Sequence, residues 1–268
     1  MIARRTLLAA GAALAAVRPA FAIDPGKASG RYNHEGADFK LTHAIALAVD
    51  NTEGFSEGAG LRVLLSDREV PVSALYGLAF PPVWGMARDG KVEGLLLKFD
   101  PADKTSLVAT ILTKPEPGYS LGTTSISNSE GLWTRLDAGP TRVSGELKAD
   151  ASEAMVFEFS APVFTNAVEA DLKGAAAAAS EPVKVLVARA EAIGRGDFKA
   201  AAALSADPSA FDNIPPEALK EAPRMSALMA RELRRAKRVV IRRETAAVML
   251  GKGEWSSVVK VDGVWKAD

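Results

Sequence analysis

Residues 40–49 read KLTHAIALAV, in which large apolar side chains alternate with small or polar ones. Leu41, Ile45 and Leu47 share one parity, with His43 between them, and this period of two indicates a β-strand with one apolar face. Similar short runs lie at 61–66, 92–99, 106–112, 132–137, 142–148 and 155–160, separated by turn residues. Seven short strands at this spacing predict an antiparallel β-sandwich or barrel.

The hydrophobic period changes after residue 181. Apolar residues at three- and four-residue spacing predict a helix over 183–193, followed by helices at 198–204 and from 215 to about 235, the last broken near Pro223. Strands follow at 238–243, 245–250, 255–261 and 264–266. We therefore expect an α+β protein of two domains: an all-β domain at 23–170, a linker at 171–181, and a small domain of helices and a curled sheet at 182–268. The alanine run within 171–181 also fits the first turn of the next helix.

The first 22 residues, MIARRTLLAAGAALAAVRPAFA, have the order of an export signal: a charged start, an apolar run at 7–17, and Ala20-Phe21-Ala22. We expect cleavage after Ala22 and a periplasmic mature protein. The Arg4-Arg5 pair resembles a twin-arginine signal, and the general secretory route fits the same residues. The apolar run is shorter than the roughly 20 residues of a membrane span, so we expect no transmembrane segment in the mature chain.

The amino-acid composition excludes some kinds of functional site and shows an uneven distribution of charge. The chain has no cysteine, which excludes disulfides, thiol catalysis and cysteine metal sites. Residues 23–180 carry 14 Lys+Arg and 21 Asp+Glu, a net charge of −7, whereas residues 181–268 carry 16 and 12, a net charge of +4. Opposite charges predict that the two parts attract each other or that the second part has a basic face for a partner.

The last 85 or so residues resemble a family. The segments that carry the likeness are 188–198 (ARAEAIGRGDF), the alternating 245–250, and 261–266 (VDGVWK). Together they resemble the small nuclear-transport-factor-like, or cystatin-like, domains of exported bacterial proteins. The resemblance implies helices packed on a curled sheet, with a pocket between them that holds a small apolar ligand.

Catalytic patterns are weak. Residues 118–122 match G-x-S-x-G, but prolines precede them, no helix pattern follows, and both histidines lie upstream, so we interpret them as a loop. His34, Glu35, Asp38 and His43 form a cluster with metal or acid–base potential, which we interpret as structural. Asp212, Glu217 and Glu254 are the acids considered for the second domain, which has no His, Cys or Tyr. We predict no catalytic, metal or cofactor residues.

Two segments are candidates for binding. Residues 72–86 carry Tyr76, Phe80 and Trp84, which form either a ligand or partner site or a plug that closes the β domain. The basic run 231–243 includes Arg234, Arg235 and Arg238, which meet a partner or are solvated.

These features predict a non-catalytic periplasmic binding or assembly protein. Its expected partner is an envelope protein or an anionic surface, and the export signal argues against nucleic acid. The alternative is a domain that binds, and acts on, a small apolar ligand in the pocket of the second domain.

Overall fold

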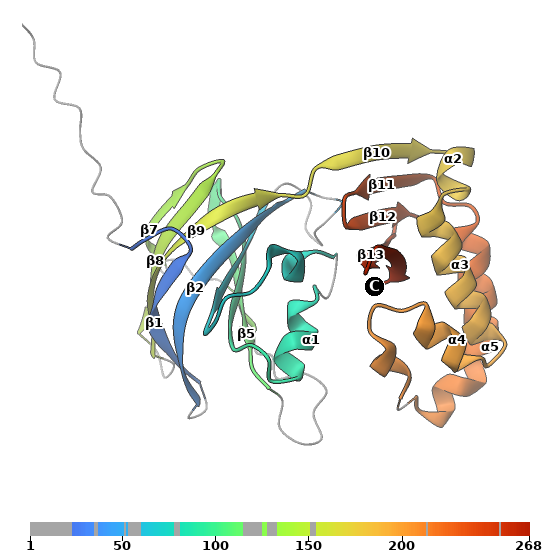
Figure 1. Ribbon diagram of the computed structural model, residues 1–268, viewed down its shortest axis with the longest axis horizontal. Coiled ribbons are helices and arrows are strands. Elements are labelled where there is room, and N and C mark those ends of the chain that lie inside the picture. Colours follow the sequence, from blue (N-terminus) through green and yellow to red (C-terminus); the bar gives the residue numbers. More distant parts are fainter. Residues whose placement is uncertain are drawn as a thin grey trace, which may run out of the picture.

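The structure, a computed structural model, describes residues 23–34, 37–50, 52, 60–77, 81–114, 125–127, 133–150, 154–212, 214–251 and 253–268. These residues form an α+β fold with two β-sheets, and most of the helices lie beside the second sheet (Figure 1). The larger sheet comes from the first part of the chain, and the smaller sheet from the part that follows residue 167.

Nine strands form the larger sheet, in the spatial order β6-β5-β4-β3-β2-β1-β9-β8-β7. Neighbouring strands run antiparallel, and β2 also pairs in parallel with the end of β9. The strands are β1 (Lys27–His34), β2 (Ala37–Val49), β3 (Gly60–Ser66), β4 (Gly94–Asp100), β5 (Asp103–Leu112), β6 (Ser125–Ser127), β7 (Trp133–Ala138), β8 (Arg142–Asp150) and β9 (Ala154–Thr165). All seven strands predicted from the alternation are present, and β1 and β6 are additional to them.

The larger sheet curls until strands that are distant in its order touch. Trp133 of β7 packs edge-on against Phe99 of β4, with ring centroids 5.1 Å apart. Gly145 of β8 permits this approach, because a Cβ atom there would lie 2.6 Å from the Trp133 ring and 2.7 Å from the Phe159 ring. The sequence predicted a sandwich or a barrel; the structure is a half-barrel made of one curled sheet (Figure 1).

Strand β2, which contains the KLTHAIALAV stretch, is buried on both faces. Ala44 and Ala46 belong to the core inside the curl, whereas Leu47 belongs to a second core on the outer face, against which Ile45 packs. The alternation predicted one apolar face. The second face is also covered, and its small alanines suit the concave side of the sheet, where neighbouring strands converge.

Two short helices cover the outer face of the curled sheet. They are the 3-10 helix η1 (Val72–Leu75) and α1 (Val83–Arg88). Leu75 and Val83 are fully buried and share a core with Leu64 and Leu96 of the sheet. Figure 1 shows both helices on the side of the curled sheet that faces the smaller sheet.

Five antiparallel strands form the smaller sheet, in the order β10-β11-β12-β13-β14. They are β10 (Val168–Lys173), β11 (Arg238–Arg242), β12 (Thr245–Met249), β13 (Trp255–Val261) and β14 (Val264–Ala267). The helices of this part are α2 (Ala175–Ala178), α3 (Glu181–Gly194), α4 (Phe198–Ala203), the 3-10 helix η2 (Pro208–Phe211) and α5 (Pro216–Leu233). Helices α3, α4 and α5 and the last four strands lie where the sequence predicted them, whereas η2 was not predicted and α2 lies in the segment predicted as a linker.

The segment predicted as a linker, 171–181, is structured. Its first residues finish β10, where Leu172 pairs with Val239 of β11, and α2 follows with Ala177 buried. The chain therefore crosses from the first sheet to the second at Asn166 and Ala167, between β9 and β10. Leu172 packs against the apolar core beside the second sheet, which explains why this segment joins that sheet.

Pro223 does not break α5, so the prediction of a break there was wrong. The helix runs from Pro216 to Leu233 with Pro223 inside it. An internal proline costs a helix about 3 kcal/mol, because it removes one hydrogen bond and crowds the preceding turn. Packing offsets this cost: α3 approaches so closely that a Cβ atom on Gly194 would lie 3.4 Å from Ser226 of α5.

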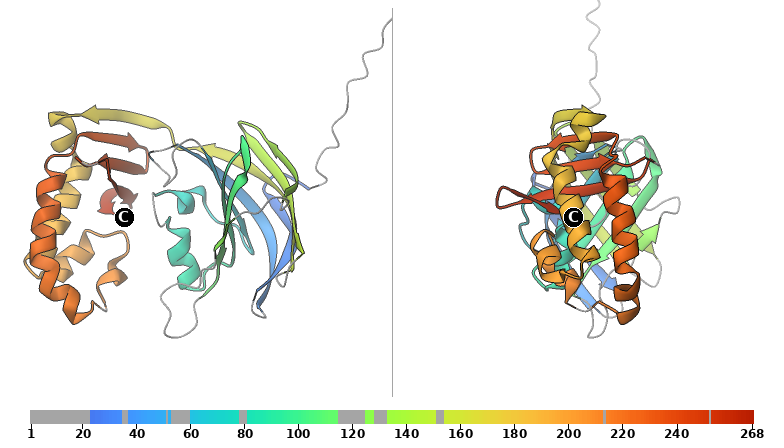
Figure 2. Two further views of the ribbon diagram at one scale, coloured as in Figure 1. Left: turned by 180° about the vertical axis from the view of Figure 1, so that it is seen from behind. Right: turned by 90° about the vertical axis from the view of Figure 1, so that its right-hand side faces the viewer.

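Both faces of the smaller sheet are buried. Val239, Val248 and Val258 point towards the helices and form a core with Leu186 and Leu233. On the other face, three apolar residues and two polar ones are at most 5% exposed: Val240, Ala247, Val259, Arg242 and Thr245. This second face looks towards the larger sheet (Figures 1 and 2), so the smaller sheet lies between its helices and the half-barrel.

Candidate functional site

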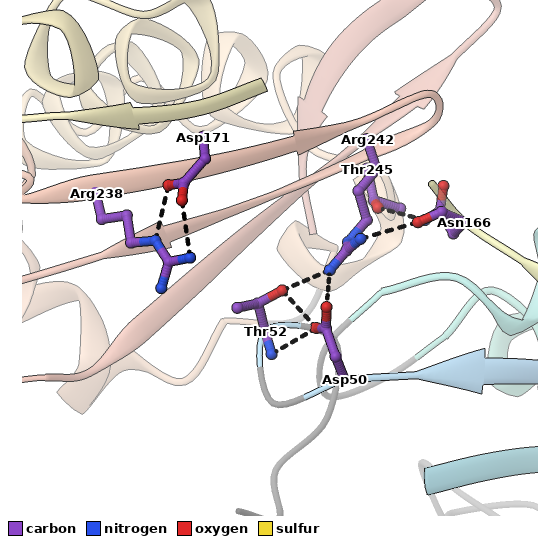
Figure 3. Close-up of polar contacts among 7 residues, drawn as sticks. All are labelled: Asp50, Thr52, Asn166, Asp171, Arg238, Arg242 and Thr245. Carbon is purple, nitrogen blue, oxygen red and sulfur yellow. Dashed lines mark hydrogen bonds and ion pairs between the residues drawn. The ribbon is translucent and has the colours of Figure 1, made fainter. Parts of the chain in front are cut away.

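A buried arginine joins the two sheets. Arg242 is the last residue of β11, and its side chain is 4% exposed. Its Nη1 donates a hydrogen bond to the carbonyl oxygen of Asn166 at 2.8 Å. Its Nη2 donates to Asp50 Oδ2 at 2.5 Å and to Thr52 Oγ1 at 2.7 Å (Figure 3). Because Asp50 directly follows β2, this ion pair ties the smaller sheet to the half-barrel.

The partners of Arg242 are themselves held in place. The backbone N–H and the hydroxyl of Thr52 both donate to Asp50 Oδ1, at 2.8 and 2.6 Å. Burial raises the pKa of Asp50, but the hydrogen bonds from Thr52 and Arg242 outweigh it and hold the pKa below its ordinary value. Asn166 Nδ2 donates to Thr245 Oγ1 at 2.8 Å, so the crossing segment is fixed to β12 as well.

A second ion pair lies nearer the solvent. Arg88 of α1 donates from Nη1 to Asp207 Oδ2 at 2.8 Å, and Asp207 precedes η2. The hydrogen bond from Arg88 holds the pKa of Asp207 below its ordinary value. In this pair the cation comes from the first part of the chain and the anion from the second. The junction therefore depends on individual pairs rather than on the net charges of the two parts.

Two further cations lie in the sheet beside this junction, Arg62 fully buried and Lys98 half-buried. Arg62 of β3 is 1% exposed, and its Nη1 donates to the carbonyl oxygens of Leu75 and Gly77, at 2.8 and 2.5 Å. Lys98 of β4 is paired with Arg62 in the strand register. Burial, and after it the positive charge of Arg62, lowers the pKa of Lys98 to about 8.

A narrow recess lies between the sheets. Gly77 (φ +104°) approaches the last residue so closely that a Cβ atom there would lie 2.8 Å from Asp268 Oδ2, which accepts a hydrogen bond from Ser257. Thr52, Arg242 and Ala247 also line the recess. Its volume of about 10 Å³ is close to that of a single water molecule. The arrangement holds two sheets together and has room for little else.

Two of the three aromatic candidates, Tyr76 and Trp84, pack against the outer core of the half-barrel. Tyr76 and Trp84 are partly buried and pack against the core that contains Leu64 and Leu75. Phe80 lies outside the described residues. The two described side chains thus contribute to the layer that η1 and α1 form between the sheets.

The three arginine candidates do not form one group. Arg234 pairs with Glu191 of α3, and Arg238 makes two hydrogen bonds to Asp171 of β10, at 2.8 and 3.0 Å (Figure 3). Arg235 is exposed in the turn after α5. The basic run is therefore divided among a helix pair, a strand pair and the solvent.

Among the acid–base candidates, the structure describes the side chains of His43, Asp212 and Glu254. His43 is half-buried, and its Nδ1 lies 2.9 Å from the hydroxyl of Thr42. The side chains of His34, Glu35, Asp38 and Glu217, and all of residues 118–122, lie outside the described part of the chain. Asp212 and Glu254 are exposed. Among the residues that the structure describes, no three His, Asp or Glu side chains are grouped as a metal site requires.

Sequence reasoning missed the residues of the junction. A signal for two of them exists: Arg62 and Lys98 are single cations within the apolar runs LRVLLS and LLLKFD. A lone cation inside a buried strand needs acceptors, so such a position points to a specific contact. Asp50 and Arg242 have no comparable signal, because they lie 192 positions apart at strand ends.

Comparison of the chain with family models, with curated proteins and with solved structures gives no match. Within the described ranges, none of the helices combines the length and the apolar character that crossing a membrane demands.

Proposed function

We propose that this chain is a non-catalytic binding or assembly protein and that α5 carries its partner surface. The observation behind this proposal is a patch of exposed apolar side chains. Met225, Leu228 and Met229 are 50%, 43% and 45% exposed. At spacings of three and four residues they are neighbours on the helix surface, so they form one patch rather than scattered positions.

The patch is concentrated on one element. Among the described residues, nine large apolar side chains are exposed, and four of them belong to α5, the fourth being Leu219. The opposite side of α5 is well packed, since Ser226, Ala230 and Leu233 are buried. A helix that is anchored on one side and apolar on the other fits a surface that another molecule covers.

The packing beside the smaller sheet favours assembly over a ligand pocket. Small and apolar side chains fill the space between the helices and the sheet, with Leu186, Leu233 and Val248 at its centre and Trp265 at its edge. A small apolar ligand would need this space. The filled core therefore supports a role for the outer surface of the helices.

Native complexes test this proposal. We expect the wild-type protein in cell extracts to migrate as a species larger than one chain on native gels. Met225→Lys with Leu228→Lys should shift it to the size of the monomer. Val264→Lys is the matched control, because Val264 is 57% exposed on β14 and should leave the complex intact. Identical migration of the wild type and the α5 variant would refute the proposal.

The proposed place of action is the periplasm. The order of residues 1–22 supports export with cleavage after Ala22. N-terminal sequencing of envelope material should start at Ile23, and a different start would contradict this cleavage. Replacing Arg4-Arg5 by Lys-Lys should block export on the twin-arginine route and leave secretory export unchanged.

A further inference from the structure

The outer face of α5 carries a repeat of seven residues. Glu221, Met225, Leu228 and Glu232 of α5 follow one another at spacings of four and three, and Arg235, in the turn directly after the helix, continues the spacing. This spacing keeps side chains on a single stripe and is the pattern through which two helices pack together. Met225 and Leu228 form the middle of the stripe, and charged residues lie at both ends.

The charges at the two ends complement each other when the helix is reversed. Glu221 and Arg224 precede the apolar middle, whereas Glu232 and Arg235 follow it. In an antiparallel pair centred on Leu228, Glu221 of one helix meets Arg235 of the other, and Arg224 meets Glu232. Two-fold symmetry forms each of these pairs twice.

We propose that the partner of the α5 patch is a second copy of this chain, bound through an antiparallel, two-fold symmetric pairing of α5. This inference rests on the proposed function of α5 as a partner surface. Helix α5 stands with α3 at the outer end of the molecule, and the right-hand view of Figure 2 shows no element lying across it. A second α5 can thus approach along its length.

The charge pattern favours this partner over an anionic lipid surface. A lipid-binding helix has cations around an apolar face, whereas here Glu221 and Glu232 lie on the same stripe as Met225 and Leu228. The flanking Arg224 and Arg231 form ion pairs with these two acids. Arg234, which would add positive charge, pairs with Glu191 of α3. Acidic groups at the two ends of the stripe would be repelled by anionic lipid, whereas in a second copy they meet arginines.

Sedimentation equilibrium of the purified mature chain tests the proposal. One helix pair buries less than the roughly 1,200–2,000 Å² of stable interfaces, so we expect a monomer–dimer equilibrium in the micromolar range. Glu221→Arg and Arg235→Glu should each weaken the dimer about tenfold, because each substitution replaces two attractive pairs by two repulsive ones. Glu221→Arg combined with Arg235→Glu should restore it.

The controls keep the outcomes distinct. Circular dichroism of each variant establishes that these exposed substitutions leave the fold intact, and Val264→Lys should not change the dimer. A purified chain that stays monomeric up to millimolar concentration, or a double charge reversal that fails to restore the dimer, overturns self-association. If α5 still determines the size of the native complex in extracts, the proposed function survives with a different partner.

Anionic vesicles provide the remaining comparison. Sedimentation of a monomeric chain with vesicles of phosphatidylglycerol, strengthened by Glu221→Arg, would assign the patch to lipid and would overturn the dimer. Weak retention that Glu221→Arg does not change would agree with the dimer.

Discussion

The connection between the two sheets depends strongly on one side chain, that of Arg242. Its guanidinium serves three acceptors, two of them just after β2 and one in the segment that crosses between the sheets, while almost completely hidden from solvent. A buried arginine of this kind is stable only when its donors are used, because an unpaired buried charge is costly. Neighbouring Arg243 has a side chain that is 83% exposed, which provides an internal control.

Arg242→Ala should therefore destabilise the protein by about 3 kcal/mol, since it leaves Asp50 without its cation and opens a void between the sheets. Arg243→Ala should change the stability by less than about 0.5 kcal/mol. Urea unfolding of both variants at pH 7 measures the difference. Equal stability of the two variants would show that the junction contributes nothing to the fold.

The Asp50–Arg242 ion pair also makes the stability of the fold depend on pH in the acid range. The pKa of Asp50 is lowered in the folded protein, so its contribution to stability is present above the unfolded value of 3.8 and is lost as the pH falls through the folded value. Asp50→Asn should flatten this part of the curve of unfolding free energy against pH between about 5 and 2. A variant that keeps the wild-type acid slope would contradict this assignment.

Lys98 destabilises the folded state at neutral pH, whereas Asp50 stabilises it. Its pKa falls from 10.5 to about 8 on folding, so the charged amine opposes the folded state at neutral pH. Stability should rise as the pH increases from about 8 to 10.5, where the unfolded chain binds more protons than the folded one. Lys98→Met should remove this rise and stabilise the protein at pH 7 by about 1–2 kcal/mol, because solvent screens part of the charge.

Exposed Lys148 on β8 is the matched control for that experiment. Lys148→Met should alter neither the stability at pH 7 nor its rise at alkaline pH. Chemical unfolding at pH 7, 9 and 10.5 compares the three proteins. A loss of stability in Lys98→Met at pH 7 would mean that the amine makes a favourable contact that outweighs its burial.

At the scale of elements, the curl of the first sheet depends on β8. Gly145 lies between the rings of Trp133 and Phe159, where a Cβ atom has no room. Gly145→Ala should cost about 1–3 kcal/mol through overpacking of the interior. Trp133→Phe makes space there, so the double variant should lose less stability than the sum of the two single variants.

Gly139, on the turn between β7 and β8, is the control. A Cβ atom at Gly139 would lie 3.3 Å from one carbonyl oxygen, so Gly139→Ala should have a smaller effect. Thermal melts of the wild type and of these four variants give the comparison. If Gly145→Ala proves as harmless as Gly139→Ala, the sheet has more freedom at β8 than the close packing implies.

The sequence predicted these elements well and their assembly less well. Alternation located the strands from β2 to β5 and from β7 to β9, and the helical period located α3 and α4, because both signals are local. Strand β10 was missed, since VEADLK is mostly polar and becomes a strand only by pairing with β11. Pro223 was taken to break a helix, but the packing of α5 on α3 decides its conformation.

The candidate site was less predictable for the same reason. The patch on α5 consists of ordinary helix-forming residues, and only the three-dimensional packing shows which of them are left exposed. Leu233 and Leu228 look alike in the sequence, yet the first is 2% exposed and the second 43%. The Asp50–Arg242 contact requires the full topology, because the strands from β3 to β10 lie between its members along the chain.

At the scale of the whole molecule, the junction bears on how many units unfold. The face of the smaller sheet that looks towards the half-barrel buries Val240, Ala247 and Val259, together with Arg242. Separation of the two parts would expose these residues. We therefore expect the intact chain to unfold in a single cooperative transition, with the two sheets acting together.

Calorimetry tests this expectation. A fragment that begins at residue 167 keeps β10, and it should melt below the intact chain because one apolar face of its sheet meets water. Fragment 181–268 lacks β10 and should be less stable still. Two separate transitions in the intact chain, one of them matching the 167–268 fragment, would show two independent domains.

The long separation between Asp50 and Arg242 along the chain also determines when their contact can form during synthesis. The strands of the half-barrel are all synthesised once residue 165 has left the ribosome, whereas Arg242 emerges far later. In a chain that crosses a membrane unfolded, Asp50 would reach the far side before Arg242. The half-barrel would then expose the face that looks towards the smaller sheet until the rest of the chain arrives. A chain that folds before crossing would carry the closed junction with it. The route taken by the proposed export signal would thus decide in which compartment the two sheets meet.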